Sequence, residues 1–145
     1  MRKYKLIALG GMLGAILRYL IKNIHIYNEY IPINTFLINV SGSFLLALIL
    51  TISFETFEFD SDLRLGIATG FLGAYTTFST LCKETVNLIR QGDYYSAISY
   101  IGLSTIMGLA AAYFGVVVAR EVVSKFVNPK KDSDELELED EKEAD

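Results

Sequence analysis

The sequence has little of what catalytic and disulfide-stabilised proteins need. Its 145 residues include one cysteine, Cys82, and one histidine, His25. A single cysteine excludes an internal disulfide and a cysteine-based metal cluster. The histidine falls in a polar connection, which favours a surface position over a ligand role. The sequence also has no phosphate-binding loop, dinucleotide fingerprint, zinc-ligand spacing or nucleophile–base pair, so it does not predict an enzyme.

Charge is missing from three long stretches of the chain. Residues 31–54, 65–82 and 94–119 contain no Asp, Glu, Lys or Arg. A fourth apolar segment near the N-terminus is interrupted by Arg18 and Lys22. A membrane-spanning helix needs about 20 mostly apolar residues, and 52% of this chain is hydrophobic. We therefore predict an all-α membrane protein with four transmembrane helices, at about residues 5–24, 33–54, 64–90 and 94–119.

The formal net charge of −4 is set by the end of the chain. Residues 132–145 hold nine acids and one lysine, whereas residues 1–131 carry a net charge of +4. We predict a membrane domain over 1–128 and an acidic, disordered tail over 129–145. Four spans place both termini at one end, which would carry eight Lys and Arg against three at the other. By the positive-inside rule the termini are expected in the cytoplasm. The basic residues are too dispersed for a nucleic-acid surface.

The third apolar segment has an unusual centre. Residues 70–81 read Gly-Phe-Leu-Gly-Ala-Tyr-Thr-Thr-Phe-Ser-Thr-Leu. Irregular backbone at membrane depth is tolerated only where protein or a hydrated cavity surrounds it, and transport proteins place ions at broken helices. We therefore predict a break in the third helix. Gly73 and Thr76 flank it, and backbone carbonyls freed by a break are ligands for hard cations.

Four other side chains in the spans are candidates for function. Arg18 lies about 18 Å along the first helix from residue 6, where it either serves a polar path or extends to the membrane surface. Asn39 offers either an N–H donor to an anion or a hydrogen bond between helices. Phe78 either turns its positive ring edge to an anion or packs against a neighbour. Glu84 is the carboxylate near the third span and is expected in a vestibule or headgroup layer.

Three ordered motifs carry a resemblance to a known family. They are Gly10-Gly11-Met12-Leu13-Gly14-Ala15-Ile16-Leu17-Arg18-Tyr19, then Asn34-Thr35 through Asn39-Val40-Ser41-Gly42-Ser43-Phe44, then Gly70-Phe71-Leu72-Gly73 followed by Thr76-Thr77-Phe78-Ser79-Thr80. Together they resemble the fluoride channel family called Fluc or CrcB. The resemblance covers residues 6–119.

The resemblance implies an antiparallel, dual-topology dimer with two anion pores in the plasma membrane of a prokaryote. It implies a structural Na⁺ at the dimer centre, held by the backbone carbonyls of Gly73 and Thr76 of each subunit. Asn39 would point its amide into the pore, and Phe78 would present its ring edge to fluoride. The implied polar track and vestibules comprise Ser79, Thr80, Tyr100, Ser104, Thr105, Arg18 and Glu84. The implied function is passive export of fluoride.

Two positions depart from the family pattern, and three alternatives stay open. Leu81 stands where a second pore phenylalanine is usual, and Asn34 where a glycine is common. The chain could instead supply one subunit of an unequal pair. A proton-coupled multidrug exporter can also be a four-span dimer, although it needs a membrane-embedded carboxylate. A membrane scaffold without transport would use the glycines only for packing.

Overall fold

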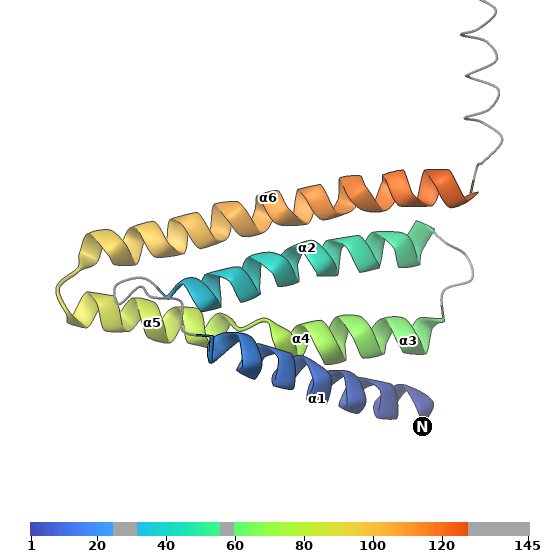
Figure 1. The fold of residues 1–145 in the computed structure, drawn as a ribbon, viewed down its shortest axis with the longest axis horizontal. Coiled ribbons are helices and arrows are strands. Elements are labelled where there is room, and N and C mark those ends of the chain that lie inside the picture. Colours follow the sequence, from blue (N-terminus) through green and yellow to red (C-terminus); the bar gives the residue numbers. More distant parts are fainter. Residues whose placement is uncertain (25–31, 56–59, 128–145) are drawn as a thin grey trace, which may run out of the picture.

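The structure is a computed structural model that describes residues 1–24, 32–55 and 60–127, and within these ranges every regular element is a helix (Figure 1). His25 and the acidic tail at 129–145 lie outside the described residues. The helices are α1 (Arg2–Lys22), α2 (Ile33–Glu55), α3 (Ser61–Leu65), the π-helix η1 (Gly66–Leu72), α4 (Gly73–Tyr75), α5 (Phe78–Arg90) and α6 (Tyr94–Val127). The all-α class is therefore confirmed for the described part of the chain.

Three of these helices, α1, α2 and α6, are long and apolar enough to cross a membrane. Helix α6 has 34 residues and ends at Val127, beyond the predicted end at residue 119. It is about 51 Å long, which exceeds the roughly 30 Å thickness of a bilayer core. The third predicted span is a series of short helices from α3 to α5. It is interrupted at Thr76 and Thr77, which confirms the predicted break.

The backbone of α1 packs directly against the backbone of η1. A Cβ on Gly10 would collide with the carbonyl oxygen of Gly66, and one on Gly14 would collide with that of Phe71. A Cβ on Gly70 would in turn meet the carbonyl of Ile7 at 2.5 Å. Small residues at such positions let helices approach closely in a membrane, where van der Waals packing drives association. The glycine pattern of the first motif therefore lets α1 pack directly against η1, the first part of the broken segment.

On the other side of the broken segment, α2 packs along α6, so that the helices lie in the order α1, broken segment, α2, α6 (Figure 1). The core between these layers is small. One cluster joins Ile38, Leu72 and Tyr75, which are 1–4% exposed. A second cluster joins Leu81, Leu88, Ala97 and Tyr100. Many large apolar side chains on the outer faces are exposed in the single chain, as expected for surfaces that face lipid or a partner.

Two ion pairs, Arg2 with Asp60 and Arg120 with Glu55, connect helix ends at the end of the bundle where the N-terminus lies. Asp60 precedes α3, where its carboxylate accepts hydrogen bonds from the N–H groups of Asp62 and Leu63. Those bonds, above all the one from Asp62, and the nearby Arg2 lower the pKa of Asp60. Arg120 of α6 contacts Glu55 of α2 at 3.2 Å. Because these groups are exposed, each pair contributes little to stability.

The glycine contacts predict a sharp contrast between two neighbouring alanine substitutions in α1. Gly14→Ala should destabilise the protein by about 1–3 kcal/mol, because the added methyl group must displace the backbone of Phe71. Gly11→Ala is the matched control, since its Cβ would meet its nearest neighbour, the Gly70 carbonyl oxygen, at 3.9 Å. Denaturation in detergent measures both. Equal stability of the two variants would contradict the close backbone contact.

Candidate functional site: a helix break and the groove beside it

The break consists of two residues with extended backbone. Thr76 has ψ 156° and Thr77 has φ −150° and ψ 106°, so neither can continue a helix. Helix α5 restarts at Phe78, and the Thr77 side chain caps it by accepting a hydrogen bond from the N–H of Thr80. Ser and Thr are favoured at this capping position because their hydroxyl replaces a missing helical partner. Gly42 of α2 leaves room for the Thr76 side chain, which fills the space that a Cβ would occupy.

Asn39 binds both backbone groups of Thr77. Its Oδ1 accepts from the Thr77 N–H at 2.8 Å, and its Nδ2 donates to the Thr77 carbonyl at 3.1 Å. An unpaired peptide group in an apolar environment is costly, so this pairing compensates for the interrupted helix. The predicted donor at Asn39 is therefore engaged with protein. These two bonds use only one of the two N–H groups of the amide, so the other is still available.

The two predicted cation ligands are carbonyls whose helical donors are diverted. In a continuous α-helix, the N–H of Thr77 would donate to Gly73 and that of Thr80 to Thr76. Here Thr77 donates to Asn39 and Thr80 donates to the Thr77 hydroxyl. Carbonyl oxygens freed in this way fit a hard cation such as Na⁺. The described residues contain no cluster of three or more His, Cys, Asp or Glu that could hold a metal ion.

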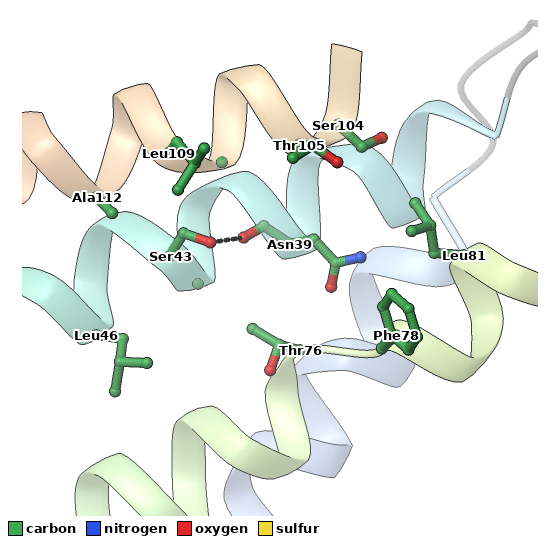
Figure 2. Close-up of a pocket in the computed structure, with 12 residues that line it drawn as sticks. Asn39, Ser43, Leu46, Thr76, Phe78, Leu81, Ser104, Thr105, Leu109 and Ala112 are labelled. Carbon is green, nitrogen blue, oxygen red and sulfur yellow. Dashed lines mark hydrogen bonds between the residues drawn. The ribbon is translucent and has the colours of Figure 1, made fainter. Parts of the chain in front are cut away.

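A groove of about 410 Å³ opens beside the break, between α2, α5 and α6 (Figure 2). It brings together the predicted pore residues Asn39, Phe78, Ser104 and Thr105. The Phe78 side chain is 77% exposed. Thr105 donates to the Ile101 carbonyl, whereas the buried Ser104 hydroxyl has no hydrogen-bond partner among the described residues. The groove thus presents hydroxyls and an aromatic ring on an otherwise apolar wall.

Leu81 lies between the groove and the hydrophobic core. It lines the groove, yet it is only 8% exposed and belongs to the core cluster with Leu88, Ala97 and Tyr100. Its side chain therefore serves packing between α5 and α6. Ser79 and Thr80 lie in the first turn of α5, where both hydroxyls approach that of Thr77, at 3.3 and 2.8 Å. They lie next to the groove and are not part of its lining.

Glu84 forms a second polar centre that joins four helices. Its carboxylate accepts hydrogen bonds from Thr35 of α2 and Tyr100 of α6, each at 2.9 Å. Lys22 of α1 lies 3.7 Å from the same carboxylate. The predicted residue Tyr100 is therefore brought to Glu84 and not to the groove. Arg18 is half-buried, lies outside both centres, and makes no hydrogen bond or ion pair with the residues that the structure describes.

Next to this centre, Asn34 links two helices. Its amide donates to the carbonyls of Lys22 at 3.2 Å and Ile24 at 2.8 Å, at the C-terminal end of α1. These carbonyls lack helical donors because the helix ends there. The asparagine that departs from the usual glycine at this position therefore caps α1 from α2.

Comparisons with known proteins identify the family of this chain. A family model described as "CrcB-like protein, Camphor Resistance (CrcB)" matches residues 5–116. The chain belongs to the CrcB family.

Relatives in this family are similar over most of their length. A protein of Sulfurihydrogenibium sp. named "Fluoride-specific ion channel FluC" is 38% identical over 122 residues, covering 83% of this chain and 98% of that protein. Proteins with the same name from Thermosipho melanesiensis and Acidobacterium capsulatum are each 42% identical. They cover 81% and 84% of this chain, and 96% and 99% of their own lengths. The family indicated by the three motifs is thus confirmed.

Three residues of this CrcB chain were not singled out from the sequence. Thr77 caps α5, while Thr35 and Lys22 bind Glu84. One signal was present in α2, since Thr35, Asn39 and Gly42 recur at the spacing of a single helical face. No signal linked this face to Glu84, because their contact depends on how the helices pack.

Removing one partner of Glu84 should destabilise the protein. Tyr100→Phe deletes a hydrogen bond to a largely buried carboxylate, and such bonds contribute about 1.5–3 kcal/mol. Tyr95→Phe is the matched control on the same helix, because Tyr95 is 84% exposed; its effect should stay within about 0.5 kcal/mol. Denaturant unfolding in detergent measures both. A Tyr100→Phe protein as stable as the control would refute the contribution of this contact.

Proposed function

We propose that this chain is a passive, fluoride-selective channel that exports fluoride across the plasma membrane. The single observation that carries the proposal is the groove beside the break, where polar side chains and the Phe78 ring meet within an apolar helix bundle. The names of the relatives support it, since they are called fluoride-specific ion channels. Apolar helices long enough to cross a bilayer support a multi-pass membrane location.

The chemistry of the groove suits a small, strongly hydrated anion. A channel must replace the water of the ion with other ligands, yet bind the ion weakly enough to release it. The hydroxyl of Ser104, the remaining N–H of Asn39 and the edge of Phe78 are donors without a full positive charge, whereas the hydroxyl of Thr105 would first have to give up its bond to the Ile101 carbonyl. A fixed cation in the groove would trap the ion. Outward movement follows the negative-inside membrane potential, which supplies about 2.3 kcal/mol per charge per 100 mV.

We propose that the pore is completed by a second, antiparallel subunit. The groove is open on one side, and Phe78 at its edge is largely exposed. An exposed apolar side chain of a membrane protein faces either lipid or a partner, and a partner here would close the open side of the groove. The second subunit is another copy of this chain or a paired paralogue. The carbonyls of Gly73 and Thr76 from both subunits would hold a structural Na⁺ between them.

Two other functions are less well supported. A proton-coupled exporter needs a carboxylate that exchanges protons during transport. Glu84 is instead engaged by Thr35, Tyr100 and Lys22. A scaffold without transport needs no groove lined by polar side chains.

Fluoride efflux from liposomes tests the proposed function. The purified chain, reconstituted alone, should release trapped fluoride rapidly, independently of a proton gradient and with generation of a voltage. Vesicles that retain fluoride would exclude a homomeric channel. Restoration of efflux by a co-expressed paralogue would then assign the chain to an unequal pair.

The role of Phe78 is tested in the same assay. Phe78→Leu removes the ring quadrupole and should slow efflux about tenfold, equivalent to about 1.4 kcal/mol. Phe54→Leu is the control, since Phe54 is also exposed but lies at the end of α2, against Arg64. Equal efflux by both variants would remove Phe78 from the pore.

The acidic tail is expected to be dispensable for transport. Residues 132–145 lie outside both the family match and the described residues. Deleting them should leave fluoride efflux unchanged. Loss of efflux in a truncated chain that still folds would assign the tail a role in transport.

A further inference from the structure

We propose that Asn39 is a positioning residue that holds the third span in its broken form. Both ends of its amide are used for this purpose, and both contact a single residue, Thr77. The proposal concerns the helix break itself, so it does not depend on fluoride transport. It goes beyond a role for Asn39 as a donor to an ion.

The first step in the argument is the match of chemistry. Thr77 presents one N–H donor and one carbonyl acceptor, and the side-chain amide presents the complementary acceptor and donor. The two distances, 2.8 and 3.1 Å, are both good hydrogen bonds. An aspartate could accept from the N–H but not donate to the carbonyl. A leucine of similar shape could do neither, so the pairing requires an amide.

The second step is the position of Asn39 on α2. Gly42, one turn along the same face, admits the side chain of Thr76. The Ser43 hydroxyl donates to the backbone carbonyl of Asn39 at 2.9 Å, which leaves the Asn39 side chain free of competition from that hydroxyl. The face of α2 therefore receives both residues of the break, Thr76 by shape and Thr77 by hydrogen bonding.

The third step is what the pairing prevents. Without Asn39, the N–H and the carbonyl of Thr77 would both lose their partners in apolar surroundings, which is costly. The extended backbone of Thr76 and Thr77 would no longer be held in place, and neither would the Gly73 carbonyl and the Phe78 ring that flank it. Asn39 thus helps to keep Gly73 available as a ligand. This last consequence rests on the proposed sodium site, whereas the pairing itself does not.

Hydrogen exchange at the Thr77 amide tests the proposal in the purified full-length chain. Asn39→Leu should speed exchange about tenfold or more, because the N–H loses its acceptor. Asn39→Asp should keep the protection, because a carboxylate still accepts, and should shift the amide proton resonance downfield through a charge-assisted bond. Ser43→Ala, one turn along α2, is the control and should leave Thr77 exchange unchanged.

The wild-type protein provides a second test if Asn39→Leu fails to fold. Solid-state NMR in lipid should give cross peaks from Asn39 Cγ to Thr77 N and from Asn39 Nδ2 to the Thr77 carbonyl carbon. Absence of both peaks would overturn the proposal. Unchanged Thr77 exchange in a folded Asn39→Leu protein, or exchange in Asn39→Asp as fast as in Asn39→Leu, would overturn it as well. A wild-type chain that shows the pairing but releases no fluoride would reject the proposed function alone.

Discussion

The break in the third span leaves peptide groups that need new partners, and the structure is organised around this requirement. Lipid offers no hydrogen bonds, so a break at membrane depth is stable only if neighbouring groups replace the helical bonds. Asn39 replaces them for the backbone of Thr77, and the Thr77 hydroxyl replaces one for Thr80. The break is therefore a property of two segments, α2 and the third span, and not of the third span alone.

The helix layers follow from this constraint. Glycines let α1 lie against the backbone of η1, which encloses the broken segment from one side. On the other side, α2 supplies Asn39 and space at Gly42 for Thr76. Glu84 of α5, beyond the break, then connects α5 to three other helices, because its partners come from α1, α2 and α6. A largely buried carboxylate with three partners is satisfied where an unpaired one would be destabilising.

The two polar centres of this CrcB chain, at Glu84 and in the groove, differ in how completely their polar groups are hydrogen-bonded. At Glu84 the described groups are paired with one another, and Asn34 caps the adjacent end of α1. In the groove, the Ser104 hydroxyl has no partner within the described residues, and Phe78 is exposed. Buried polar atoms are normally satisfied. In the proposed channel, an anion and a second subunit would complete this side of the groove.

The sequence by itself determined the all-α membrane class, the break and the family, because hydropathy, glycine spacing and polar residues in apolar runs are local signals. Asn39 and Phe78 were singled out from these signals, and Ser104 and Thr105 through the family resemblance. The four do meet in one groove. Only the tertiary structure decided that Tyr100 contacts Glu84, that Leu81 belongs to a packed core, and that the Asn39 amide binds Thr77. These outcomes depend on helix rotation and on contacts between residues up to 38 positions apart, which the pattern within a single helix does not encode.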